Sequence, residues 1–336
     1  MKGNLGNRFP VEEIGMTENI FLPKIELSLL YADENEFEER FLTLLRLKDD
    51  AGIKQIGFIA EEEVIAKWES TKGKTIPEVK EILNSHVRGP LDKLLMASSL
   101  LIQYDNIAPF NSLVSNFNGI YQFGGKGGIR DSEKEHLSSS VIWKEVIIRI
   151  YTLGALAVFF EKFEAIPVLT AKPWPKDYPS EAISLRFWAR HAVAMLGREG
   201  RLQPLSLCVA AVEKIRQLKW LFKKFRNDED LFLNAVCQFD FLQCICGLFK
   251  SGLSRYDDVF PSFGIFPNQN TEPIVLDLIL KGKSRAAIPD LTDQELATVI
   301  KLLDKYASER FSNFDRWDPN NWRKDEIREF LKKNLS

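Results

Sequence analysis

The amino-acid sequence predicts a mainly α fold, a multi-helix globular body with a small strand-containing N-terminal part. Three observations lead to this prediction. After Asp131 the apolar residues recur at helical spacing almost to the end of the chain. Residues 24–31 instead alternate between polar and apolar side chains, which is the period of a β-strand. The 336 residues are 45% hydrophobic, and this is ample for a large core.

The composition divides the chain into four parts. Residues 1–19 are polar and predict a flexible arm, and residues 20–123 predict an N-terminal α+β part. Glycines 124, 125, 127 and 128 predict a hinge over residues 124–130, followed by a helical domain over residues 131–336. No segment of the sequence resembles another, so no internal repeat is expected.

Individual elements follow from the local pattern. Strands are expected at Lys24–Tyr31 and Ile53–Ile59, and Asp33 is expected to cap a helix over Glu34–Leu47. Thr292 and Glu295 have the spacing of a capping box at the start of a late helix. The other main helices are expected at Glu61–Glu69, Pro77–Asn84, Pro90–Tyr104, Asp131–Phe163, Ser180–Leu196, Leu205–Phe225 and Asp228–Phe249.

Charge and cysteine content narrow the function classes. The chain has 45 basic and 47 acidic residues, so a protein that coats nucleic acid is not expected, and any nucleic-acid contact would be local. The apolar stretches around residues 146–160 and 231–249 are interrupted by Arg149 and Asp240, so no membrane span is expected. Asp240 lies in so apolar a helix that it is expected to be paired. The four cysteines lie in apolar helical patterns, which predicts free thiols in a reducing compartment and hence a cytoplasmic protein.

The sequence predicts no metal and no cofactor. The three histidines are scattered, and Cys244 and Cys246 are two residues apart, so they point to opposite sides of a helix. Gly73-Lys74-Thr75 is similar to the end of a phosphate-binding loop, but Trp68 occupies the position where that loop needs its first glycine.

Two arginine–histidine pairs carry the enzymatic alternative. Five residues separate Arg130 from His136, and four separate Arg186 from His191. This Arg-x(4–6)-His spacing resembles the active-site motif of the HEPN ribonucleases, which are helical bundles. The resemblance implies metal-independent RNA cleavage by a toxin or defence-type effector. Histidine would take the 2′-hydroxyl proton, and arginine would stabilise the charge on the phosphate. The same residues also fit an ordinary helix with a polar edge.

A stripe of cations provides the leading binding site. Positions 216, 219, 223 and 226 share one side of the expected helix, while apolar residues occupy the other side. This pattern fits a surface that contacts phosphates or an acidic partner, and it also fits a plain solvated face. The predicted binding residues are Arg216, Lys219, Lys223 and Arg226.

No complete motif for catalysis is present, so the sequence favours a non-enzymatic intracellular interaction protein. We expect it to dock a macromolecular partner, most simply a protein, through the basic stripe or through the aromatic loop at residues 251–274. The metal-independent ribonuclease is the alternative, and sequence-independent nucleic-acid binding through the basic stripe is a third interpretation.

Overall fold

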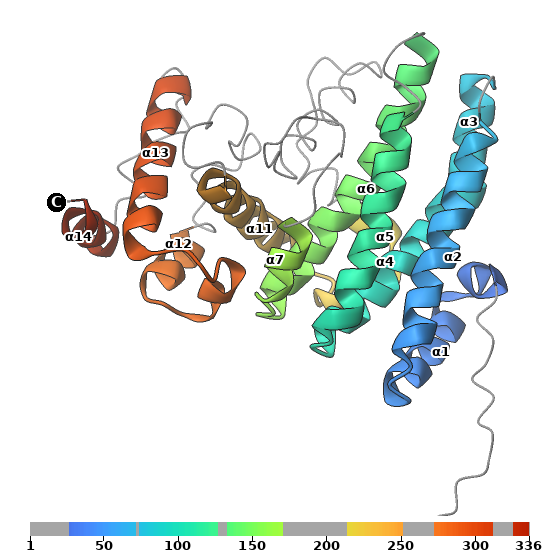
Figure 1. The fold of residues 1–336 in the computed structure, drawn as a ribbon, viewed down its shortest axis with the longest axis horizontal. Coiled ribbons are helices and arrows are strands. Elements are labelled where there is room, and N and C mark those ends of the chain that lie inside the picture. The colour runs from blue at the N-terminus through green and yellow to red at the C-terminus, as the bar shows by residue number, and fades with distance from the viewer. Residues whose placement is uncertain are drawn as a thin grey trace, which may run out of the picture.

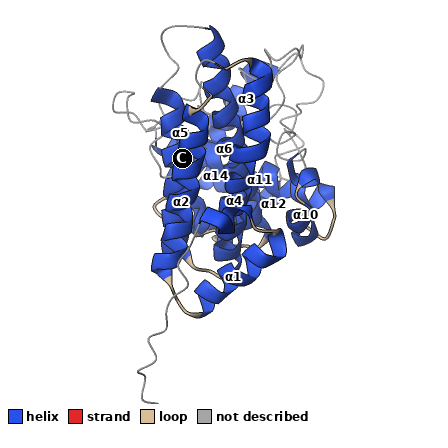
Figure 2. Ribbon diagram, turned by 90° about the vertical axis from the view of Figure 1, so that its right-hand side faces the viewer, coloured by secondary structure: helices blue, strands red, loops and turns tan. Residues whose placement is uncertain are grey.

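The structure, a computed structural model, describes residues 27–71, 74–126, 133–170, 214–250, 272–311 and 325–335. Within these ranges every regular element is a helix, and the strand-containing N-terminal part that the sequence predicts is wrong (Figure 2). The first half contains η1 (Leu27–Tyr31), α1 (Glu34–Arg46), α2 (Asp50–Glu69), α3 (Ile76–Ile82), η2 (Leu83–Val87), α4 (Arg88–Gln103), α5 (Ile107–Lys126), α6 (Glu133–Phe159) and α7 (Ala165–Thr170). The second half contains α10 (Lys219–Lys224), α11 (Glu229–Lys250), α12 (Glu272–Ile279), η4 (Lys283–Ala287), α13 (Asp293–Phe311) and α14 (Asp325–Asn334).

The first predicted strand ends in a 3-10 helix. Within Lys24–Tyr31, the described residues form η1, where Leu29 and Leu30 are both buried. A strand sends neighbouring side chains to opposite faces, so it cannot bury two adjacent leucines in one core. A tight helical turn can.

The second predicted strand, Ile53–Ile59, lies inside the long helix α2. The buried residues Ile53, Ile56 and Ala60 are three and four positions apart, which is the spacing of one helix face. A seven-residue window was too short to separate this period from a buried strand.

Several predicted helix ends are confirmed. The Asp33 carboxylate accepts hydrogen bonds from the amides of Asn35 and Glu36, both at 2.9 Å, and so caps α1. Thr292 and Glu295 form the predicted capping box, in which each side chain accepts a hydrogen bond from the other residue's amide. The helices α4, α6 and α11 also lie close to their predicted ranges.

The division into domains stays a prediction. Helix α5 continues through Gly124 and Gly125 to Lys126, and the rest of the proposed hinge lies outside the described residues. The buried apolar residues of α1 to α7 form one cluster with those of α11 to α14.

The helices α4 and α6 run side by side in the same direction with a single register. Three ion pairs join them or the turns that follow them, namely Arg88–Glu145, Asp92–Arg149 and Asp105–Lys162. In each pair the two residues are 57 positions apart in the sequence. The constant offset means that the two helices are parallel and stay in register along their length.

The helices α2 and α5 show the same offset and also lie next to each other (Figure 1). Each is 20 residues long. The buried positions of α2 recur in α5 at the same offset, although the residues differ. These positions are Ile53, Ile56, Ala60 and Val64 in α2, and Phe110, Leu113, Phe117 and Tyr121 in α5.

The turn within each helical pair recurs as well. Lys48 after α1, Asp105 after α4 and Glu161 after α6 all adopt a left-handed backbone, with φ of 53°, 61° and 55°. Each ends its helix with the same two amide-to-carbonyl hydrogen bonds, which is a Schellman cap. The pairs α1–α2, α4–α5 and α6–α7 are therefore stacked helical hairpins, as in helical repeat proteins. The hairpin arrangement and its burial pattern recur while the residue identities do not, so the recurrence is one of structure and not of sequence.

Lys48→Gly is expected to stabilise the protein by about 1 kcal/mol, because a side chain at positive φ is strained and glycine is not. Lys54→Gly, at an exposed position inside α2, is expected to destabilise it by about 1 kcal/mol. Urea unfolding of both variants measures the two free energies. A destabilising Lys48→Gly would contradict this account of the turn.

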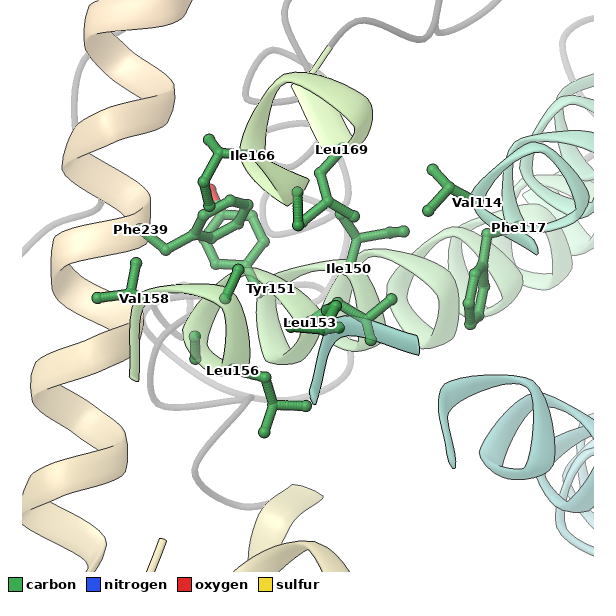
Figure 3. Packing of buried hydrophobic residues seen from close by; sticks show 14 of the residues in the cluster. Val114, Phe117, Ile150, Tyr151, Leu153, Leu156, Val158, Ile166, Leu169 and Phe239 are labelled. Carbon is green, nitrogen blue, oxygen red and sulfur yellow. The ribbon is translucent and has the colours of Figure 1, made fainter. Parts of the chain in front are cut away.

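Helix α6 occupies the middle of the core. Every residue from 145 to 158 is buried, as expected for a central helix. Helices α4, α5, α7 and α11 surround it. Figure 3 shows Phe239 of α11 against Tyr151 of α6, with Ile166 and Leu169 of α7 nearby. The helices α12 to α14 lie at the opposite end of the molecule from α1 to α3 (Figure 1).

Candidate functional site

A buried network of charges joins α4 to α6. Arg149 is fully buried, and its guanidinium donates to Asp92 Oδ1 from Nε at 3.0 Å and from NH2 at 2.5 Å. It also donates from NH1 to Glu145 Oε2 at 2.8 Å. Arg88 donates to the other oxygen of Glu145, at 2.7 Å and 2.9 Å. The parallel register of the two helices places these four residues together, because each helix contributes two residues one turn apart.

The electrostatics of the network follow from burial and close partners. Burial alone would raise the pKa of Glu145, but the guanidinium groups of Arg149 and Arg88 outweigh it and hold the pKa at about 2. Burial would likewise lower the pKa of Arg149, and the carboxylates of Asp92 and Glu145 raise it instead. The ionised forms are therefore the stable ones in the folded protein.

Glu145→Gln is expected to flatten the acid limb of the stability curve. The pKa of Glu145 is about 2 in the folded protein and 4.5 ordinarily, so the unfolded chain binds the proton first as the pH falls. The carboxylate thus contributes about 3 kcal/mol above pH 4.5, and this is lost as the pH falls from 4.5 to 2. Urea unfolding between pH 7 and pH 2 should show a smaller decline for the variant. Parallel curves would refute this assignment.

Lys214 extends the network to a third part of the chain. Its ammonium donates to Asp92 Oδ2 at 3.0 Å, and the side chain is nearly buried. Burial and the neighbouring charge of Arg149 lower the pKa of Lys214 to about 8, against the opposing effects of Asp92 and Glu145. Lys214 begins a stretch that we call the basic segment, residues 214–226.

The basic segment lies along α4 and is held by apolar contacts and by a second lysine. The apolar residues of the segment are buried, and Phe225 contacts Phe159 and Phe232 at ring-centroid distances of 4.7 Å and 4.9 Å. Lys224 donates to Gln103 Oε1 at 2.8 Å. The buried apolar residues are Ile215, Leu218, Leu221 and Phe225.

The single helix predicted over Leu205–Phe225 is wrong within the described residues. Residues 214–217 form one helical turn, Leu218 leaves the helical conformation with φ −106° and ψ 83°, and α10 begins at Lys219. Leu218, at the break, is buried and only 6% exposed. Arg216 therefore lies on the helical turn before the break, whereas Lys219 and Lys223 lie on α10 after it.

All four predicted binding residues are exposed. Arg216 is paired with Glu229, to which its NH2 donates at 2.8 Å. Lys219, Lys223 and Arg226 form no ion pair with any residue that the structure describes. We call these three residues the basic surface. Arg226 has a φ of 58°, at the cap that ends α10, so the turn fixes its position.

The residues of the ribonuclease hypothesis are not brought together in the described part. Arg130, Arg186 and His191 lie outside the described residues. His136 belongs to α6, but its side chain is not described. The hypothesis stays a prediction, and so does the role of the aromatic loop, whose residues 251–271 also lie outside the described ranges.

The remaining candidates have structural partners. Asp240 is paired as expected, since it accepts a hydrogen bond from the Tyr151 hydroxyl at 2.7 Å in the core. Cys237, Cys244 and Cys246 are buried and form no disulfide with one another. Among the described residues no group of histidine, cysteine and carboxylate side chains is arranged to hold a metal ion. None of the described helices combines the length and the apolar character needed to cross a bilayer.

Sequence reasoning missed the five residues of the charge network. Two signals were available. Arg149 interrupts the most apolar stretch of the chain, which requires a buried partner. Glu145 and Arg149 are also four residues apart, as are Arg88 and Asp92, so each pair shares one helix face. The long-range pairing between the two helices had no signal in a single sequence.

Comparisons of the chain with family models, with curated proteins and with solved structures find no match. The side chains of the basic segment and the network behind it are therefore the observations that bear on function.

Proposed function

We propose that the chain is a non-enzymatic interaction protein that docks an acidic surface of a protein partner through Lys219, Lys223 and Arg226. The observation that carries this proposal is that three exposed cations without ion-pair partners among the described residues stand on a segment that is packed in place. The packed segment fixes the backbone of these residues, and their charges have no ion pair to a described residue that a carboxylate of a partner would have to displace, so both features favour association.

A protein partner fits the basic surface better than a nucleic acid does. Three phosphate contacts give a salt-sensitive affinity that is weak at physiological salt, because each contact contributes a slope of about 0.9 in log affinity against log salt. The net charge of the chain is −2, so the rest of the molecule adds no attraction for a polyanion. Trp220 and Phe222 lie partly exposed between the cations, and aromatic residues beside cations are typical of protein interfaces.

Charge reversal tests the proposal. Gln217 is exposed beside the basic surface and can be replaced with a photo-crosslinking amino acid in cells that produce the chain. We expect a specific crosslinked protein that is lost when Lys219, Lys223 and Arg226 are all changed to Glu. The matched control changes Lys54, Lys301 and Lys332 to Glu, which alters the net charge equally at exposed positions elsewhere. The control is expected to keep the crosslink.

A second crosslinker position excludes general stickiness. Phe58 on α2 is 55% exposed and accepts an aromatic crosslinker without loss of packing. The same partner is expected from position 217 and not from position 58. An equal yield from both positions, or equal loss in the reversed and the control variants, would remove the proposal. Crosslinks to RNA alone would replace the protein partner with a nucleic acid.

We also propose a cytoplasmic location. Cys237, Cys244 and Cys246 are buried and form no disulfide with one another, which supports this location, because compartments that keep thiols reduced favour cysteines without disulfides.

A further inference from the structure

One carboxylate connects the buried charge network to the basic segment. Asp92 accepts from Arg149 through Oδ1 and from Lys214 through Oδ2. Lys214 is 7% exposed and stands at the start of the segment, five residues before Lys219. The ion pair between Lys214 and Asp92 thus joins the segment that carries the basic surface to the core, although neither residue belongs to that surface.

The segment is attached to α4 at both ends. Lys214 binds Asp92 at one end and Lys224 binds Gln103 at the other, with sequence separations of 122 and 121 residues. The nearly equal separations mean that the segment runs parallel to α4. Ile215, Leu218 and Leu221 are buried between these two attachments, so polar and apolar contacts together hold the segment with its cations facing outward.

The Lys214 attachment can open without disrupting the rest of the network. If Lys214 leaves, Asp92 keeps both hydrogen bonds from Arg149, and Glu145 keeps those from Arg149 and Arg88. The opening therefore leaves the buried carboxylates paired, which confines the change to the segment.

We propose that Lys214 is a positioning residue, an ion-pair latch to Asp92 that holds the basic segment against α4 and thereby sets the affinity of the basic surface for its acidic partner. The inference rests on the proposed function, but the latch itself is measurable without any partner. The charge of Lys214 makes the latch sensitive to pH. Burial and Arg149 lower the pKa of Lys214 to about 8, and the charged groups facing it are Asp92 of α4 and Arg149 and Glu145 of α6.

Hydrogen exchange tests the latch. Lys214→Met in the full chain is expected to raise amide exchange of residues 215–226 about tenfold at pH 7, because one charged hydrogen bond is lost. Exchange in α4 and α6 is expected to stay unchanged. Lys219→Met is the matched control, since this exposed lysine of the same segment has no ion-pair partner among the described residues, and it should not alter exchange. Unchanged exchange in Lys214→Met would overturn the latch.

A pH comparison separates the latch from general loosening. The pKa of Lys214 is about 8 in the closed segment and 10.5 ordinarily, so an opened segment would bind the proton more tightly. Loss of the proton above pH 8 therefore favours the closed segment, in which the neutral amine can still donate to Asp92. After correction for intrinsic rates, protection of residues 215–226 in the parent chain is expected to rise between pH 7 and pH 9.5, whereas in Lys214→Met it should not change with pH. An equal change in both chains would show that other groups cause it, and this would overturn the role of Lys214.

Binding of a polyglutamate peptide, the probe for the acidic partner, completes the test. Lys214→Met is expected to weaken binding about tenfold, although Lys214 is buried away from the probe, and Lys214→Arg is expected to recover part of it. If exchange rises but the affinity stays the same, the latch does not control the surface and the inference fails. If the parent chain binds no polyglutamate while exchange still rises in Lys214→Met, the proposed function fails and the segment attachment alone stands.

Discussion

Arg149→Met is expected to destabilise the protein by about 3–5 kcal/mol. Removing one partner from a buried ion network leaves charges that water cannot reach, and this cost is larger than the net contribution of the intact network. Arg149 is fully buried and donates to both Asp92 and Glu145, so its loss affects two carboxylates. Urea unfolding monitored by circular dichroism measures the change.

The matched control for this prediction is Arg216→Met. Arg216 is paired with Glu229 at an exposed position, so the same substitution there should cost less than about 1 kcal/mol. The double variant Arg149→Met with Glu145→Met should cost less than the sum of the two single variants, because the second change removes a carboxylate that the first one left short of a partner. Additive costs, or equal costs at positions 149 and 216, would contradict the network.

Gly154→Ala is expected to destabilise the protein by about 3 kcal/mol or more. A Cβ atom at position 154 would overlap the ring of Phe239 on α11. That ring is fully buried and packs edge-on against Tyr151 at a centroid distance of 5.4 Å, so it has no room to withdraw. Overpacking of this kind forces helices apart or side chains out of their rotamers. Thermal unfolding gives the magnitude.

Gly89→Ala is the control for this contact. Gly89 also lies in a helix, but nothing stands within 4 Å of the position that a Cβ would take. Alanine there should be neutral or stabilise the protein by up to about 1 kcal/mol, since alanine is the better helix former. Phe239→Leu should rescue part of the loss in Gly154→Ala. A mild effect at Gly154, similar to that at Gly89, would contradict the close packing of α6 on α11.

The predictions from sequence succeeded where one helix face or one cap decided the structure. Asp33 and the Thr292–Glu295 pair predict helix starts because their side chains hydrogen-bond to nearby amides. The apolar sequence of α6 predicts its burial. They failed at residues 24–31 and 53–59, where short windows resembled strands. The recurring hairpin was not visible in the sequence, because it is carried by burial positions such as Ile53 and Phe110 that hold different residues.

The candidate site was predictable only on its outer side. Helical spacing in the sequence predicts that Arg216, Lys219 and Lys223 are exposed, and they are. The network behind them depends on contacts between residues 57 and 122 positions apart, such as Asp92 with Arg149 and with Lys214. No local pattern encodes such distances. Arg130, Arg186 and His191 lie outside the described residues, so the ribonuclease alternative stays a prediction.

The measurement that tests the central claim most directly is the dissociation constant for the partner identified by crosslinking at position 217. With Lys219, Lys223 and Arg226 changed to Glu, we expect binding to weaken about 100-fold, because three attractive contacts become repulsive. The variant with Lys54, Lys301 and Lys332 changed to Glu should bind within about twofold of the parent chain, since its charges change away from the surface. Equal dissociation constants for the parent chain and the Lys219, Lys223 and Arg226 variant would contradict the claim that the basic surface docks the partner.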